Sequence, residues 1–227
     1  MVADSVSPSV NLERLYEYRF RDVDQATRRA VWGPIADFVW ERLGRPERVL
    51  DPAAGRCEFI GAVPARERWA VDRVGYPEAE SAGIRFLTGD ATEVELPADH
   101  FDGVFVSNFL EHLPSPDVVS GFLERMRGAL RPRGRIAIMG PNYRFAAREY
   151  WDCADHELAL THVAVEEHLY AAGFEPQETI PRFLPYSFRG RLPASAGATR
   201  AYLALPPLWR LLGKQFLVVA RKGDQPS

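Results

Sequence analysis

Short apolar segments alternate with amphipathic stretches along most of the chain. Apolar residues recur at helical spacing over 26–44, 115–130 and 162–172, which predicts a helix in each range, and a shorter apolar helix is predicted around 58–63. The remaining apolar segments are short and read as strands. They lie at 48–51, 69–72, 84–88, 101–107, 135–139, 174–180 and 215–221.

This alternation predicts the class of fold. Strands that are covered on both faces read as nearly continuous apolar runs, whereas strands with one wet face alternate between apolar and polar residues. The predicted strands are apolar throughout. We therefore expect an α/β protein with a mostly parallel, doubly wound sheet and helices on both faces.

Two long segments interrupt the alternation. Residues 141–160 are dense in aromatic and ionisable side chains, and residues 181–214 combine several prolines with a strongly apolar stretch at 201–212. Loops of this length in a compact domain are usually functional or disordered, and the aromatic and leucine content argues against disorder. We expect one domain over 1–227, with an N-terminal helical segment at 1–25 and these two segments as insertions.

Composition narrows the class of protein further. The 28 basic and 31 acidic residues give a net charge of -3, which argues against a nucleic-acid partner. The apolar runs fall far short of the roughly 20 residues that span a bilayer, and the first residues lack the pattern of a secretory signal. Only two cysteines, Cys57 and Cys153, are present, so neither a disulfide framework nor a four-cysteine zinc site can form. The expected location is a reducing cytoplasm.

Small and polar residues follow each of the first four predicted strands. In a doubly wound sheet, ligands bind outside the carboxyl ends of the strands, so these positions are the candidates for ligand binding. Asp72 can accept from both ribose hydroxyls of an adenosine, and Asp90 can accept from the adenine amino group. The full set of candidates is Asp51, Ala53, Gly55, Asp72, Arg73, Gly89, Asp90, Ala91, Ser107 and Asn108.

The motifs at these strand ends resemble those of the class I S-adenosylmethionine-dependent methyltransferases. The resemblance covers about Val49 to Pro141. It rests on Val49-Leu-Asp-Pro-Ala-Ala-Gly55, Ala70-Val-Asp72, Thr88-Gly-Asp-Ala91 and Leu130-Arg-Pro-Arg-Gly-Arg135. It implies a Rossmann-like, seven-stranded sheet whose last strand is antiparallel, S-adenosylmethionine as cofactor, and methyl transfer as the reaction.

Two further segments refine the resemblance. Asn108-Phe-Leu-Glu-His-Leu113 is similar to members that act on small molecules. Gly140-Pro-Asn-Tyr-Arg144, together with Tyr150-Trp-Asp152 and Asp155-His156, resembles a bacterial subgroup. One position departs from the family. Where the family prefers three alternate glycines after the first acid, this chain has Ala53, Gly55 and Cys57, and we interpret Cys57 as a small buried thiol.

Methyl transfer to a hydroxyl needs a proton acceptor beside the methyl group, and histidine has the best matched pKa near neutral pH. Of the five histidines, only His112 and His156 lie in segments that can meet the acceptor. We predict His156 as the general base, with Asp155 or another acid orienting it, and His112 as the reserve candidate. No metal site is expected, because the spacing of Asp155, His156 and His162 matches no zinc motif.

The two insertions are predicted to roof the acceptor pocket. Their aromatic residues favour a small-molecule acceptor, and the apolar stretch 201–212 favours one with a hydrophobic or lipid-linked part. That stretch could also form a dimer contact or a peripheral membrane contact, and a buried connection between strands is its default interpretation. The aromatic segment 15–20 either brings Tyr16, Tyr18 or Arg19 to the methionine end of the cofactor or packs on the sheet edge.

Two other functions compete with methyl transfer. A nicotinamide-dependent oxidoreductase also uses an acid about 20 residues past the first motif, but the chain contains no G-x-G-x-x-G. A non-catalytic subunit that binds S-adenosylmethionine is the other alternative, and Cys57 in the first motif is the residue that favours it. Transfer of a labelled methyl group distinguishes all three functions.

Overall fold

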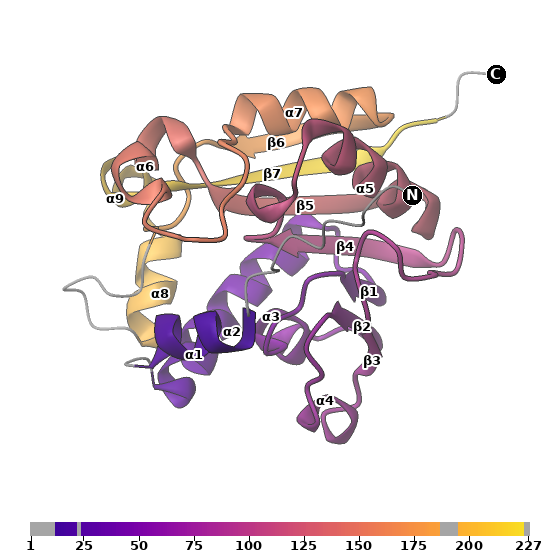
Figure 1. Cartoon of the computed structure of the whole chain (residues 1–227), viewed down its shortest axis with the longest axis horizontal. Helices are drawn as coiled ribbons and strands as arrows, with labels where there is room; N and C mark the ends of the chain where they lie inside the picture. The colour runs from indigo at the N-terminus through magenta and orange to yellow at the C-terminus, as the bar shows by residue number, and fades with distance from the viewer. Residues whose placement is uncertain (1–11, 22–23, 187–194, 225–227) are drawn as a thin grey trace, which may run out of the picture.

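The computed structural model describes residues 12–21, 24–186 and 195–224 (Figure 1). All seven predicted strands are present in one sheet with the order β3-β2-β1-β4-β5-β7-β6. Strand β7 runs antiparallel to its neighbours β5 and β6, and the other pairings are parallel. The predicted Rossmann-like fold with an antiparallel last strand is confirmed. The strands are β1 Arg48–Asp51, β2 Glu67–Asp72, β3 Arg85–Thr88, β4 Phe101–Ser107, β5 Leu130–Pro141, β6 Phe174–Ile180 and β7 Gln215–Lys222.

Strand β5 begins earlier than its apolar pattern predicted. It pairs with β4 at Leu130, directly after the preceding helix, and then again from Arg135 onward. The register shifts between these pairs, so the polar residues 131–134 lie in an irregular part of the strand. A bulge of this kind breaks the apolar run that sequence reading uses to recognise a strand.

The four predicted helices are found close to their expected bounds. They are α2 Gln25–Arg42, α3 Glu58–Ala62, α5 Pro116–Ala129 and α7 His162–Ala171. The side chains of Asp24, Ser115 and Thr161 cap three of them by accepting from a backbone N–H in the first turn. Helix α1, Leu12–Phe20, lies within the predicted N-terminal helical segment, of which residues 1–11 and 22–23 are outside the described part.

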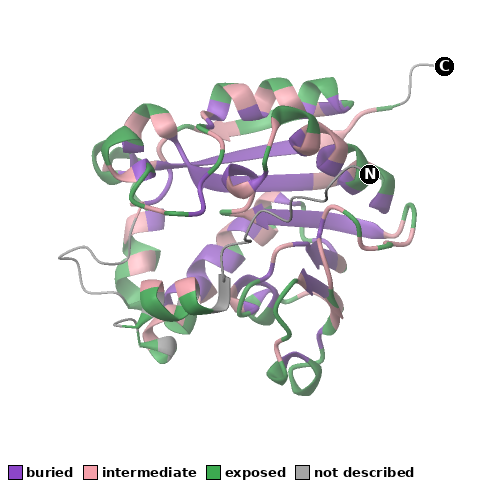
Figure 2. Ribbon diagram, viewed as in Figure 1, coloured by how far each residue is buried: buried purple, intermediate pink, exposed green. Residues whose placement is uncertain are grey.

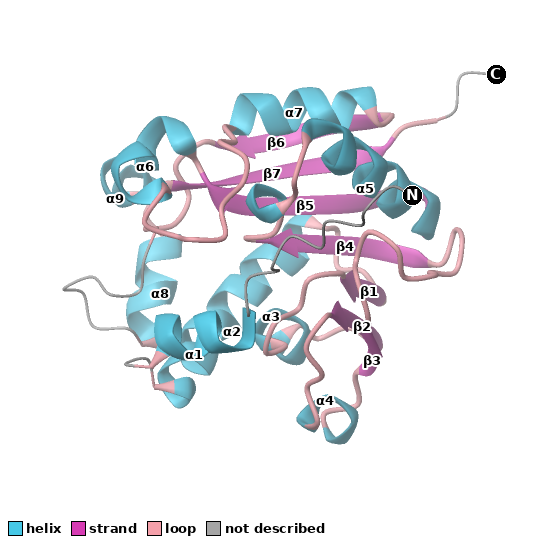
Figure 3. Cartoon of the chain, viewed as in Figure 1, coloured by secondary structure: helices cyan, strands magenta, loops and turns pink. Residues whose placement is uncertain are grey.

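Several short helices were not predicted (Figure 3). Two of them, α8 and α9, occupy the insertion 181–214, of which residues 187–194 are not described, and another, α6, opens the insertion 141–160. The unpredicted helices are α4 Glu78–Ser81, the 3₁₀ turn η1 Leu110–His112, α6 Tyr143–Tyr150, α8 Ala196–Leu203 and α9 Pro206–Leu212. None of the helices in the described ranges is long and apolar enough to cross a membrane.

The sheet separates two apolar cores (Figure 2). Helices α5 and α7 cover one face with residues such as Phe122 and Leu169, and α2, α3 and α8 cover the other with residues such as Ile35 and Ile60. Strands β4 and β7 contribute fully buried side chains to both cores. The double cover explains why the strands read as continuous apolar runs.

Candidate active site

Asp51 ends β1 and opens the first turn of the predicted cofactor site. Its side chain is buried, and its Oδ1 accepts a long hydrogen bond of 3.4 Å from the Ala53 N–H. Burial raises the pKa of Asp51 to about 8, and the charges of Asp72 and Glu58 act in the same direction. Asp51 therefore supports the turn as a buried side chain that is bonded to its backbone.

Asp72 ends β2 and joins that strand to the same turn. Its Oδ2 accepts from the Gly55 N–H at 2.7 Å and its Oδ1 accepts from the Val74 N–H at 3.0 Å. Each carboxylate oxygen has two lone pairs, so both oxygens can still accept a ribose hydroxyl. The space where a Cβ of Gly55 would stand is open, since no neighbouring atom lies within 4 Å of it. These two observations fit a bound adenosine.

Asp90, after β3, is held by its own loop and by Arg73. Its Oδ1 accepts from the Thr92 N–H at 2.8 Å and from the Thr92 hydroxyl at 2.7 Å, and its Oδ2 forms an ion pair with Arg73. Partial burial raises the pKa of Asp90, but the bonds from Thr92 and Arg73 outweigh it and hold the pKa below the ordinary value. Asp90 is therefore ionised at neutral pH and positioned by neighbours.

The remaining predicted cofactor residues lie at the same edge of the sheet. The Gly89 N–H donates to the Asp72 carbonyl at 2.9 Å, which ties the β3 end to the β2 end. Ser107 is the last residue of β4, and Asn108 follows it with a positive φ of 48°, its N–H donating to the Met139 carbonyl at 2.8 Å. The structure thus gathers the predicted residues from four adjacent strands.

Cys57 is buried at the start of α3 with a left-handed φ of 59°. Burial, assisted by the charges of Asp51 and Glu58, raises the pKa of its thiol to about 12. The side chain is therefore a neutral, buried group, as the sequence interpretation expected. Its backbone occupies the conformation that glycine adopts most easily, which is consistent with the family's preference for glycine at this position.

His112 stands in η1, just beyond β4, with its orientation set by the insertion 141–160. Its Nδ1–H donates to the Asp155 carbonyl at 2.7 Å, and the Asp155 Oδ2 lies 3.5 Å from the same nitrogen. Because Nδ1 is the donor, Nε2 is the basic atom in the neutral ring. Asp155 also forms an ion pair with Arg19 of α1, so three segments distant in sequence meet at this histidine.

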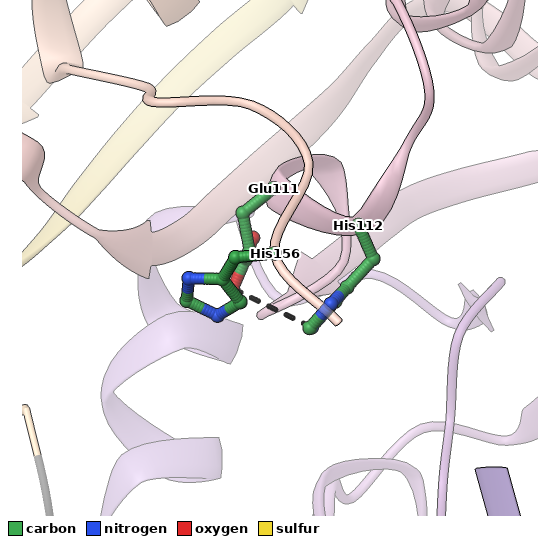
Figure 4. A group of neighbouring side chains, drawn as sticks. All are labelled: Glu111, His112 and His156. Carbon is green, nitrogen blue, oxygen red and sulfur yellow. Dashed lines mark ion pairs between the residues drawn. The ribbon is translucent and has the colours of Figure 1, made fainter. Parts of the chain in front are cut away.

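Glu111 and His156 complete the cluster around His112 (Figure 4). The Glu111 carboxylate is buried, with Oε1 4.0 Å from the His112 Nε2, and burial raises its pKa. The His156 ring is 5.0 Å from the His112 ring at 71°, and 4.6 Å from the Tyr150 ring. Burial, together with the charge of His112, lowers the pKa of His156 to about 4, so this ring is neutral at neutral pH.

The structure brings the two predicted catalytic histidines together, but their neighbours differ from those that the sequence suggested. Asp155 contacts His112, whereas the sequence suggested that it orients His156. Glu111 was missed, although its place directly before His112 in the sequence was a usable signal. His162 does not join the cluster, because its Nδ1 accepts from the Asn142 side chain at 2.9 Å.

The aromatic residues of the two insertions divide between the site and the core. Tyr150 packs on His156, and the Tyr186 hydroxyl lies 3.1 Å from the Cys153 Sγ, which connects the two insertions near the histidine cluster. Phe183, in contrast, is fully buried and stacks on Phe38, so it serves the core rather than a pocket wall. Phe188 lies outside the described residues.

The aromatic segment 15–20 was predicted either to reach the methionine end of the cofactor or to pack on the sheet edge. Arg19 reaches Asp155 beside the histidine cluster, whereas Tyr18 is 68% exposed and packs under Arg21. The Tyr16 side chain is outside the described part of the structure. Among the described side chains of this segment, Arg19 comes close to the candidate active site.

Comparison with known proteins identifies the class. The family model described as a methyltransferase domain matches residues 47–138, from the start of β1 into β5. Together with the strand-end motifs, this match supports a class I S-adenosylmethionine-dependent methyltransferase. It is an enzyme that uses S-adenosylmethionine as its cofactor and methyl donor. No curated protein matches the sequence.

Solved structures share the fold at low sequence identity. A SAM-dependent methyltransferase from Archaeoglobus fulgidus is 19% identical with a TM-score of 0.64, covering 92% of this chain and 99% of its own. The 1,6-didemethyltoxoflavin-N1-methyltransferase of Burkholderia thailandensis is 24% identical with a TM-score of 0.58, covering 98% and 94%. The [4+2]-cyclase SpnF is 18% identical with a TM-score of 0.62, covering 85% and 81%. At these identities the likeness shows the fold alone, and the fold hosts more than one reaction.

Proposed function

We propose that this enzyme transfers a methyl group from S-adenosylmethionine to a hydroxyl of a small acceptor that carries an apolar or aromatic part. The observation that supports the proposal is the cluster of Glu111, His112 and His156 at the carboxyl end of β4. The strands that precede it hold the predicted adenosine residues, so the cluster lies toward the methyl end of the cofactor. A hydroxyl acceptor gains more from such a cluster than a neutral amine, because its oxygen is a weak nucleophile until its proton is withdrawn.

The proposed reaction is a single displacement. The acceptor oxygen attacks the methyl carbon, the bond from carbon to sulfur breaks, and the sulfur keeps the electron pair to give S-adenosylhomocysteine. The hydroxyl proton leaves for solvent. The protein aligns oxygen, carbon and sulfur. His112, His156 and Glu111 together withdraw the proton from the hydroxyl, so that no single side chain serves as an isolated base.

Aromatic side chains beside the cluster favour an acceptor with an apolar part. Tyr143 and Trp151 of the insertion 141–160 are in edge-to-face contact with each other and with Tyr150, a fully buried ring that supports them and contacts His156. The more accessible rings of Tyr143 and Trp151 are of the kind that binds apolar and aromatic ligands with few polar contacts. Exposed leucines of α9, such as Leu211 at 71% exposure, are compatible with a lipid-linked acceptor, and peripheral membrane contact stays a prediction.

The test is methyl transfer to paired acceptors. Purified enzyme is incubated with S-adenosylmethionine carrying a trideuterated methyl group and with phenols, alcohols and the matching amines, and products are identified by mass spectrometry. We expect label in hydroxyl compounds and loss of this product in His112→Ala and His156→Ala, with His100→Ala as control because its ring bonds Glu67 elsewhere. Label confined to the amines, or no transfer to any acceptor, contradicts the proposal.

A further inference from the structure

Three side chains at the candidate active site form a set that metal ions bind. Glu111, His112 and His156 each direct one potential ligand atom toward the others, and these atoms lie within 4.8 Å of one another (Figure 4). Two imidazoles and one carboxylate are a ligand set of catalytic zinc sites, which leave a further position open. We propose that this cluster binds one divalent transition-metal ion, with Zn²⁺ as the best match.

The distances require a small contraction on binding. In a tetrahedral site with bonds of about 2.1 Å, ligand atoms stand about 3.4 Å apart. The His112 Nε2 and the Glu111 Oε1 are already 4.0 Å apart. His156 comes from the loop after α6, whereas the other two ligands share η1, so closing the site requires a small shift of that loop together with side-chain rotation of Glu111 or His112.

The groups around the ligands have the arrangement that metal sites use. A metal-binding histidine usually donates its second N–H to a carbonyl or carboxylate, which fixes the ring and directs the other nitrogen at the metal. His112 does this, since its Nδ1–H donates to the Asp155 carbonyl at 2.7 Å. Within the described residues, the Nδ1 of His156 is buried without a hydrogen-bond partner.

Charge near the cluster is compatible with a cation. The positive charge of Arg19 is close, but it is paired with the Asp155 carboxylate. A bound ion would therefore meet one carboxyl group and two imidazole rings, while the Arg19 guanidinium is paired with the Asp155 carboxylate.

The catalytic role of a metal at this cluster rests on the proposed function, methyl transfer to a hydroxyl. An open position on the ion accepts the acceptor hydroxyl and lowers the pKa of that hydroxyl, so the proton leaves to solvent before the oxygen attacks the methyl carbon. The ion also fixes the oxygen in line with sulfur. Binding of the ion itself depends only on the three side chains, so it is tested without an acceptor.

The experiment measures metal binding directly. Full-length protein is treated with EDTA, dialysed, and titrated with Zn²⁺ by calorimetry and with Co²⁺ by visible absorption. We expect one ion per chain and a Co²⁺ spectrum of low coordination number. Glu111→Gln, His112→Ala and His156→Ala should each weaken Zn²⁺ binding at least 10-fold, whereas His168→Ala, whose ring contacts Ser120 on the covering helices, should not. Mg²⁺ should not compete, because it prefers oxygen ligands.

Cofactor binding and methyl transfer separate the two proposals. Each variant is first checked for folding by circular dichroism and for S-adenosylmethionine binding by calorimetry. Absence of stoichiometric Zn²⁺ binding, or binding unchanged in all three ligand variants, overturns the metal proposal. If hydroxyl acceptors are still methylated by EDTA-treated protein, the proposed function stands and the metal's role fails. If Zn²⁺ binds but no hydroxyl acceptor is methylated, the metal site stands and the proposed function fails.

Discussion

The Nδ1 atom of His112 donates a hydrogen bond of 2.7 Å to the backbone carbonyl of Asp155, 43 residues further along the chain. This bond joins the turn after β4 to the insertion that follows β5. It sets which nitrogen of His112 faces Glu111, and so decides what the ring can bind. Because the acceptor atom is a backbone carbonyl, substitution of the Asp155 side chain need not remove the bond.

The ion pair between Arg19 and Asp155 should hold α1 against the active-site insertion. The side chains of the pair are 22% and 7% exposed, so we expect a contribution of roughly 1–3 kcal/mol, more than for an exposed pair. Arg19→Gln and Asp155→Asn should each increase hydrogen exchange of residues 12–20, and the double variant should add little to either. Additive effects in this cycle would show that the two side chains act independently.

Asp72→Ala should weaken S-adenosylmethionine binding. Asp72 accepts a hydrogen bond from the Gly55 N–H. In the predicted binding mode it also accepts from the two ribose hydroxyls of the cofactor. Each lost bond to a charged acceptor costs roughly 1.5–3 kcal/mol, about 10-fold to 100-fold in affinity, before relaxation. Calorimetry checks this, with the exposed Asp117→Ala as the matched control. Unchanged affinity in Asp72→Ala would remove Asp72 from the cofactor site.

Asp51→Asn should stabilise the protein more at high pH than at low pH. The pKa of this carboxyl is raised by burial from 3.8 to about 8, so between these values the unfolded chain loses a proton that the folded chain keeps. Stability of the unsubstituted protein therefore falls as pH rises through this window, and the variant lacks that loss. Urea denaturation at about pH 5 and about pH 8 measures the difference, with Asp117→Asn as control. A stability difference independent of pH contradicts the assignment.

Tyr150→Phe should destabilise the protein by roughly 1–3 kcal/mol. The Tyr150 hydroxyl donates to the Leu158 carbonyl at 2.6 Å and accepts from the Leu160 N–H at 3.1 Å, and its ring is fully buried. The phenylalanine ring fills the same space but leaves both backbone groups without this partner. Urea denaturation compares it with Tyr143→Phe, whose ring is only half-buried, and equal effects would mean that the hydroxyl of Tyr150 is dispensable.

Substitutions of Cys57 should depend on backbone conformation more than on size. With a φ of 59°, Cys57→Gly relieves backbone strain while losing a buried thiol, so its net effect should be small. Cys57→Val places a β-branched side chain in the same conformation and should cost roughly 1–3 kcal/mol. Thermal unfolding measures both, and equal stability of the two variants would show that the conformation is not retained.

The strands and the main helices were predictable because their signals are local. Double cover of the sheet makes strands apolar throughout, and residues such as Thr161 mark helix starts by capping the first turn. Helices α6, α8 and α9 were not predicted. Each of them is only 7 or 8 residues long, so the helical period repeats too few times to be recognised in the sequence.

The apolar pattern predicted the sheet and the edge where the cofactor residues gather, and the resemblance of the strand-end motifs predicted the class of enzyme. That edge follows from topology, since the carboxyl ends of parallel strands lie side by side and Asp51, Asp72 and Asp90 each follow a strand. Only the tertiary structure decided the contacts of His112 with Glu111, Asp155 and His156. These depend on where the chain after α6 returns, which is set by specific bonds such as that of Tyr150 to Leu158. Such long-range contacts leave no periodic trace in the sequence, because one side chain fixes each of them.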